Sequence, residues 1–206
     1  MTYAPLADRL WTTGKGSSLL RFAVLAIAGS LLVAAAAQIS IPVKPVPFTL
    51  QTLAVLAVGA AYGARLGAAT LGLYALEGAV GLPFFAQGKS GLFDANLAYL
   101  FPASSMGYVV GFIIAAFVVG RLVESGWGHS FGKTIFATLI GAVVLYVPGL
   151  IWLAIWASKT GVVPEGMTAV SAALNWGLYP FVLWDGVKAV LAGLAVPALG
   201  MLAKKG

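Results

Sequence analysis

The chain has 206 residues, of which 61% are hydrophobic and only 9% are charged, and its mean hydropathy is +0.98. A soluble domain needs polar residues to cover its surface and carries about 25% charged residues, so this composition excludes an ordinary soluble domain and indicates a polytopic membrane protein. The net charge of +6 does not indicate nucleic-acid binding, because the basic residues stand one or two at a time, and the absence of cysteine excludes disulfides and thiolate metal sites.

Six apolar segments follow one another along the chain, and a helix needs about 20 such residues to cross a hydrocarbon core of roughly 30 Å. We predict spans at 19–40, 49–64, 66–82, 106–123, 134–157 and 175–202. The second and third are divided by GARLG at 63–67, whose glycines permit a tight turn. The sequence therefore predicts an all-α membrane protein, a bundle of six transmembrane helices forming a single integral domain over residues 1–206.

The basic residues predict the orientation of these helices. Most of the 12 Lys and Arg flank one side of the predicted spans, namely Arg9, Lys15, Arg21, Arg65, Arg121, Lys133, Lys204 and Lys205. The loops of the other side hold Lys44, Lys89 and Lys159. Because the more positive side faces the cytoplasm, we expect both termini in the cytoplasm and the protein in a bacterial inner membrane. Alternatively, the first segment is a cleaved signal peptide, which would leave five spans and break this charge pattern.

The first predicted span carries small residues at every fourth position, Ala26, Ser30 and Ala34. Such a stripe lets a second helix approach closely within lipid. It indicates either packing inside this bundle or a docking face for a partner protein.

Two connections on the outer side have unusual compositions. IPVKPVPFTLQT, at 41–52, holds three prolines that favour a stiff, extended backbone of the kind that can serve as a lid. The connection at 81–108 is long and rich in Phe and Gly, and glycines allow the backbone to approach a bound molecule. Single aromatic residues here are explained by anchoring at the membrane interface. Together with buried charges on the same side, the two loops predict a binding pocket.

Asp185 and Lys188 lie in the otherwise apolar segment YPFVLWDGVKAVLAG. Residues three apart share one face of a helix, and ionisable groups within a bundle face its interior or a cavity. The pair is either a ligand-binding site or an internal ion pair that fixes helix packing. Glu77, in the third predicted span, is a second acid of the outward half and is either a ligand or an interfacial side chain.

Several chemistries lack the residues they need. His129 is the only histidine and has no partner for a metal site, and no phosphate-binding glycine loop with a following Lys and Ser or Thr is present. No combination of nucleophile, base and orienting group falls on adjoining faces. We therefore expect neither an enzyme nor a resident cofactor or metal, and ATP-driven transport would require a partner.

The motifs taken together resemble the BioY family, the biotin-binding S components of energy-coupling factor (ECF) transporters. The resemblance rests on IPVKPVPFTLQTLAVLAVGAAYGARLGA and LYALEGAVGLPFFAQGKSGL, then GYVVGF, YVPGLIWL and PFVLWDGVKAVLA, in this order over residues 41–196. It implies six helices, cytoplasmic termini and a biotin pocket near the outer surface, capped by the loop after the first helix.

The resemblance also implies candidate ligand residues. Asp185 and Lys188 match the Asp-x-x-Lys of the family and become the leading biotin ligands, supported by Gln51 and Tyr146 and by Glu77 as an acceptor for a ureido hydrogen. Phe48 and Tyr108 fall in the matching motifs and are further candidates. FPASSMGY departs from the family pattern, so residues 101–106 are poor candidates for transferred roles.

The expected partners are biotin, a transmembrane coupling protein and a pair of ABC-type ATPases, with the stripe of the first helix resembling the docking face of the family. Two alternatives stay open. One is an S component for a different vitamin, and the other is a biotin transporter that acts without partners.

Overall fold

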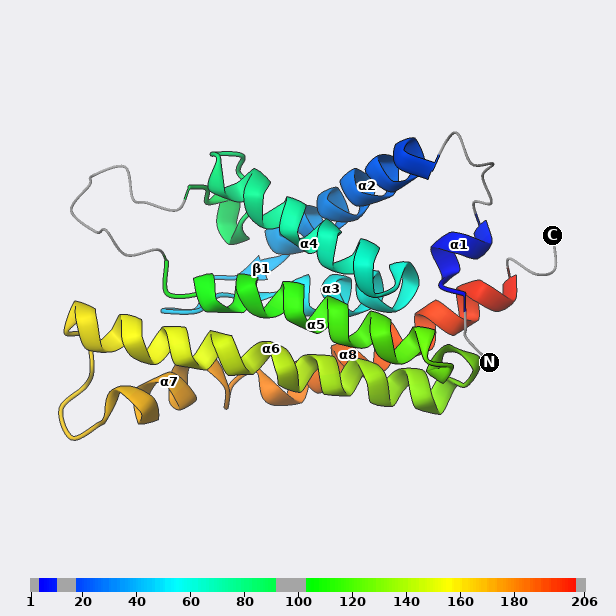
Figure 1. The fold of residues 1–206 in the computed structure, drawn as a ribbon. Helices are drawn as coiled ribbons and strands as arrows, with labels where there is room; N and C mark the ends of the chain where they lie inside the picture. Colours follow the sequence, from blue (N-terminus) through cyan, green and yellow to red (C-terminus); the bar gives the residue numbers. More distant parts are fainter. Residues whose placement is uncertain (1–3, 11–17, 92–102, 203–206) are drawn as a thin grey trace.

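The computed structural model describes residues 4–10, 18–91 and 103–202, and most of these residues are helical (Figure 1). In chain order the elements are α1 (Leu6–Leu10), α2 (Ser18–Gln38), β1 (Ser40–Ile41), β2 (Phe48–Thr49), α3 (Gln51–Tyr62), α4 (Ala64–Ala79), η1 (Ala86–Gly88), α5 (Met106–Glu124), η2 (Trp127–His129), α6 (Phe131–Thr160), α7 (Ala169–Gly177) and α8 (Val182–Leu202). The predicted helical fold class is confirmed.

Among the described residues, four helices are long and apolar enough to cross a membrane, namely α2, α5, α6 and α8. With 12 and 16 residues, α3 and α4 extend about 18 and 24 Å at 1.5 Å per residue, less than a hydrocarbon core of roughly 30 Å. The number of six transmembrane helices therefore stays a prediction, although apolar helices occur in the predicted order.

The last predicted segment, 175–202, is divided between two helices. α7 ends at Gly177 and α8 begins at Val182, with a turn over residues 178–181 between them. Pro180 lies in this turn, where it has no backbone N–H to donate and disfavours helical geometry at the preceding residue. The prediction of one helix over the whole segment is therefore wrong.

Glycines bring α3, α4 and α5 into close contact. A Cβ atom at Gly59 would lie 2.9 Å from Cα of Ala116, and one at Gly120 would lie 2.3 Å from the backbone of Gly63 and Ala64. Gly63 itself has a φ of 79°, which other residues rarely adopt, and it alone separates α3 from α4. The two short helices are thus packed closely against α5.

The stripe of small residues on α2 is also internal. Ala26, Ser30 and Ala34 are buried, and α2 packs against α4. A Cβ atom at Gly29 on the same helix would lie 2.6 Å from the methyl carbon of Thr70. The structure thus favours packing within the bundle, the alternative that the sequence left open, over a docking face formed by these three side chains.

The outer surface of the bundle is apolar where a membrane would surround it. On α6, Phe136, Val143, Val147 and Ile151 are all more than half exposed. Their spacing places them on one face of the helix, and a contiguous apolar surface of this kind is typical of contact with lipid.

The two ends of the bundle are built from different elements (Figure 1). One end carries α1, η2 and the last turns of α8, whereas β1, β2, η1 and α7 gather at the opposite end. The α6 helix, with 30 residues, reaches from one end to the other. These elements come from three separate parts of the chain, namely the β1–β2 hairpin, η1 and α7, and each contributes to the cavity described next.

Candidate ligand-binding site

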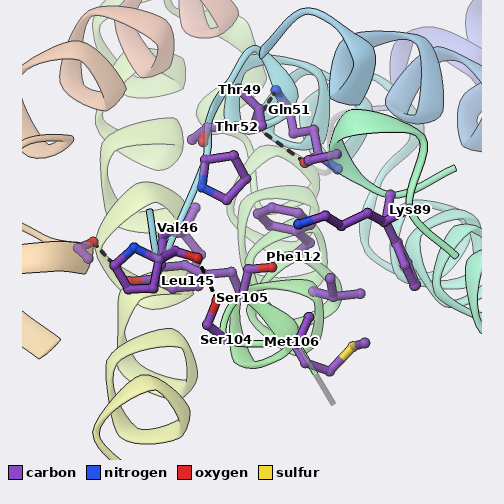
Figure 2. A pocket seen from close by; sticks show the side chains of 18 of the residues that line it. Val46, Thr49, Gln51, Thr52, Lys89, Ser104, Ser105, Met106, Phe112 and Leu145 are labelled. Carbon is purple, nitrogen blue, oxygen red and sulfur yellow. Dashed lines mark hydrogen bonds between the residues drawn. The ribbon is translucent and has the colours of Figure 1, made fainter. Parts of the chain in front are cut away.

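A cavity of about 1030 Å³ lies between the β1–β2 hairpin, the loop over residues 83–91 (hereafter loop 83–91) and the helices α3 to α8. Figure 2 shows side chains from several of these elements converging on it, among them Val46, Gln51, Lys89, Phe112 and Leu145. Its walls are mostly apolar with a few polar groups, which is the usual composition of a small-molecule site, and its size is at the upper end of the range for such sites, about 300–1,000 Å³.

Asp185 and Lys188 form an ion pair in the wall of this cavity. Lys188 Nζ lies 2.8 Å from Asp185 Oδ1. Both residues are buried, with Lys188 9% exposed and Asp185 5% exposed. They come from the first two turns of α8, where a spacing of three places both side chains on one face. A buried charge is costly unless it is paired and hydrogen-bonded, so each charge stabilises the other.

The pair is held from two sides by other parts of the chain. Tyr146 on α6 donates a hydrogen bond of 2.6 Å to Asp185 Oδ2, and Lys188 donates one of 2.7 Å to the carbonyl oxygen of Thr49 in β2. Lys188 Nζ also lies 4.7 Å from the centre of the Phe48 ring, which stacks on Phe181 in the turn directly before α8. The ion pair thereby links α6, α8 and the β1–β2 hairpin.

The charge pair still has capacity for a ligand. An ammonium group has three N–H donors and a carboxylate has about four acceptor positions. In the described part of the chain, Lys188 uses two donors and Asp185 accepts two hydrogen bonds. One N–H of Lys188 and two acceptor positions of Asp185 therefore remain for a polar molecule in the cavity.

A second set of hydrogen bonds lies in the cavity wall at α3 and α4. Gln51, the first residue of α3, donates to the Tyr74 hydroxyl at 2.7 Å, and this hydroxyl donates to the carbonyl oxygen of Phe84 at 3.3 Å. Thr49 donates to the Gln51 side-chain oxygen at 3.3 Å. These bonds connect the hairpin to loop 83–91 through the cavity wall.

Tyr108 positions α7 against α5 and α6. Its hydroxyl donates a 2.8 Å hydrogen bond to the carbonyl oxygen of Gly177, and its ring packs edge-on against Tyr146, with 6.1 Å between the ring centres. A Cβ atom at Gly177 would lie 2.3 Å from this hydroxyl, so the site requires glycine. Tyr108 thus packs against Tyr146, the residue that donates a hydrogen bond to Asp185.

The structure brings most of the predicted binding residues together. Asp185, Lys188, Gln51, Tyr146 and Tyr108 all line the cavity. The Phe48 ring contacts Lys188 Nζ, as described above, but Phe48 is not one of the residues that line the cavity.

Glu77 lies on α4 and does not line this cavity. Its Oε2 atom is buried without a hydrogen-bond partner among the described residues. A ligand role for Glu77 thus has no support from the cavity geometry and stays a prediction.

Sequence reasoning missed several polar residues of the cavity, of which Lys89 and Ser104 are two. Lys89 lies in the lining, and Figure 2 shows its side chain extending from loop 83–91 into the cavity. The sequence offered a signal, a cation within a glycine-rich loop, but it was interpreted only as a topology marker. Ser104 also lines the cavity and donates 2.5 Å to the carbonyl oxygen of Pro45.

Ser104 belongs to the segment 101–106 that the sequence set aside. Residues 101 and 102 of that segment lie outside the described residues, whereas 103–106 all line the cavity. A departure from a family motif therefore did not remove this segment from the site.

Fold and site together define, over the described residues, a helical membrane protein with a large cavity at one end of its bundle. A crystal structure at 2.1 Å of the S-component for biotin from an ECF-type ABC transporter has the same fold, with a TM-score of 0.71, 20% identity and coverage of 91% of this chain and 94% of that one. The S-component-like fold expected from the sequence is thus confirmed.

The chain belongs to the BioY family, whose model matches residues 9–205. It is 34% identical over 163 residues to the biotin transporter BioY of Thermotoga maritima, covering 79% of this chain and 86% of that protein. It is also 34% identical to the biotin transporter BioY of Rhizobium etli, covering 84% and 86%. The resemblance stated from the motifs is confirmed, and the family is one of transporters and not of enzymes.

Proposed function

We propose that this protein is the substrate-binding membrane subunit of a biotin uptake system. The observation that carries the proposal is the buried Asp185–Lys188 pair in the wall of the cavity, held by Tyr146 and by the Thr49 carbonyl. Such a pair fits an uncharged ring that both donates and accepts hydrogen bonds. The relatives named as biotin transporters support biotin as that molecule.

The chemistry of biotin matches the free capacity of the pair. Its ureido ring has two N–H donors and one carbonyl oxygen. In the proposed pose, Asp185 accepts the N–H groups and the remaining donor of Lys188 binds the ureido oxygen. Both interactions are charge-assisted and lie in a buried site, where they are stronger than in water.

The rest of the cavity suits the other end of the molecule. The bicyclic ring system and the aliphatic chain of biotin would contact apolar lining such as Phe112 and Leu145. Its carboxylate would meet Lys89, whose backbone lies in an exposed loop. A cation near the mouth attracts an anion without the desolvation cost of a buried carboxylate.

We further propose that α2, α3, α4, α5, α6 and α8 all cross the bacterial inner membrane, with the cavity facing outward. The connections and helix ends at the cavity side carry Lys44, Lys89 and Lys159, whereas Arg21, Arg65, Arg121 and Lys133 belong to helix ends on the other side. This distribution agrees with the positive-inside rule for cytoplasmic termini.

Transport is proposed to depend on partner proteins. The sequence holds no phosphate-binding loop of the P-loop type, so ATP hydrolysis would come from ABC-type ATPases coupled through a transmembrane protein. The S-component fold supports this arrangement. Uptake without partners and an S component for another vitamin remain as alternatives.

Uptake of labelled biotin by a bacterial host that lacks its own biotin transporter tests the proposal. The chain should support uptake when it is co-expressed with ECF coupling protein and ATPases, and excess unlabelled biotin should compete. Competition by riboflavin or thiamine instead would indicate another vitamin, and equal uptake without coupling subunits would favour the partner-independent alternative.

A further inference from the structure

Loop 83–91 is a compact turn that carries Lys89 at the edge of the cavity. The N–H of Phe85 donates to the carbonyl oxygen of Lys89 at 3.0 Å, which closes the turn around η1. The first half of the loop is anchored by the Tyr74 hydroxyl on the Phe84 carbonyl and by the Phe85 ring, which packs against Gly78. The second half is held at its end by the N–H of Gly91, which donates 2.7 Å to the carbonyl oxygen of Gly78. The contacts named so far that leave the loop all go to α4, and none goes to α2.

One side chain attaches the loop to α2 as well. Gln38, the last residue of α2, accepts a 2.9 Å hydrogen bond from the N–H of Gly88 through its side-chain oxygen. Its NH2 group lies 3.2 Å from the carbonyl oxygen of Phe85, and 3.4 and 3.5 Å from those of Pro83 and Phe84. A single amide therefore contacts both halves of the loop.

The chemistry of this contact is specific to a side-chain amide. The NH2 group has two hydrogens, which fit the two shortest contacts, to the carbonyl oxygens of Ala34 and Phe85 at 3.2 Å each. The oxygen is then left to accept from Gly88. A glutamate would lack the donors and a lysine would lack the acceptor, so neither could satisfy the loop backbone.

The place of Gln38 in the fold connects the loop to the opposite wall of the cavity. β1 begins two residues later, and the N–H of Leu50 donates 3.0 Å to the carbonyl oxygen of Ile39. The end of α2 is thus attached both to loop 83–91 and to the hairpin that accepts from Lys188. Gln38 therefore lies between the loop that carries Lys89 and the hairpin that contacts Lys188.

We propose that Gln38 is a positioning residue that holds loop 83–91 against the end of α2, and thereby presents Lys89 to the carboxylate of the ligand. Gln38 does not line the cavity and acts through the loop. The inference rests on the proposed function for the identity of the ligand, but the attachment of the loop is independent of it.

The loop attachment can be tested without any ligand. The chain has no cysteine, so Ser90→Cys introduces a single site for a nitroxide spin label in loop 83–91. Gln38→Leu should increase the mobility of the label in the electron paramagnetic resonance spectrum of the full chain. Gln87→Asn is the matched control, because Gln87 is an exposed amide of the same loop with a φ of 65°, which Asn tolerates. Unchanged mobility in Gln38→Leu would overturn the proposal.

The ligand part is tested by comparing biotin with its uncharged methyl ester on the unlabelled protein. Gln38→Leu should reduce the preference for biotin over the ester about tenfold, the size expected for one or two lost hydrogen bonds. Lys89→Ala should cause the same reduction. The double variant should show no further loss, because both changes remove the same contact, the one between Lys89 and the ligand carboxylate. The control Gln87→Asn should keep the preference of the wild type.

Equal loss of affinity for both molecules, or additive effects of the two changes, would contradict a positioning role. If the wild-type protein binds no biotin, the proposed function fails, whereas the spin-label spectra still decide whether Gln38 holds the loop.

Discussion

The Tyr146 hydroxyl donates to Asp185 Oδ2 across 2.6 Å, which ties the middle of α6 to the charge pair of α8. This bond fixes one carboxylate oxygen, while Lys188 fixes the other. Asp185 therefore cannot rotate freely, and its remaining acceptor positions face the cavity in a defined direction.

Removing this hydroxyl should weaken ligand binding without disrupting the fold. Tyr146→Phe keeps the ring that packs against Tyr108 but loses a hydrogen bond to a charged group, worth about 1.5–3 kcal/mol. We expect the affinity for biotin to fall about tenfold or more in equilibrium binding. Tyr179→Phe makes the same chemical change at an exposed tyrosine and should bind as the wild type does. Equal affinities for both variants would show that the bond does not orient Asp185.

The charge pair should be separable into a folding role and a binding role. Asp185→Asn or Lys188→Met leaves the other charge buried and unpaired, which costs about 3–5 kcal/mol of folding stability. The double variant removes both charges, so its thermal unfolding midpoint in detergent should return most of the way to that of the wild type. It should nevertheless bind no biotin. Wild-type affinity in the double variant would mean that the pair serves packing alone.

The sequence was sufficient to predict the helical membrane class and the shared face of Asp185 and Lys188, since both depend on composition and on local spacing. It could also have located the break between α7 and α8, because Pro180 marks it. The bonds from Lys188 to the Thr49 carbonyl and from Gln38 to loop 83–91 could not be predicted. They join side chains to backbone atoms far away in the chain, and no residue pattern encodes such pairings.

Tyr108 packs so closely against Gly177 that adding one methyl group at Gly177 should lower the stability of the fold. Gly177→Ala would place a Cβ atom 2.3 Å from the Tyr108 hydroxyl, so the helix or the ring must move, at a cost of about 1–3 kcal/mol. Gly72→Ala is the matched control on α4, where an added Cβ atom would meet no atom within 4 Å apart from the backbone of its own helix, and alanine should stabilise the helix by about 0.5–1 kcal/mol. Thermal unfolding of both variants should show shifts of opposite sign, and equal shifts would contradict the packing described for α7.

The proposed orientation can be tested with the same cysteine-free background. Ser125→Cys lies between α5 and α6, and Glu165→Cys lies between α6 and α7, at opposite ends of α6. In intact cells a membrane-impermeant thiol reagent should label position 165 and reach position 125 only after the membrane is opened. The reverse pattern would place the cavity on the cytoplasmic side.

Equilibrium binding of labelled biotin to the purified protein tests the central claim most directly, with the wild type measured beside Asp185→Asn and Lys188→Met. The cavity described here predicts saturable binding near one molecule per chain, competed by unlabelled biotin and not by riboflavin or thiamine, and weakened in both variants. Biotin binding that neither substitution affects, or no biotin binding by the folded wild-type protein, would contradict it.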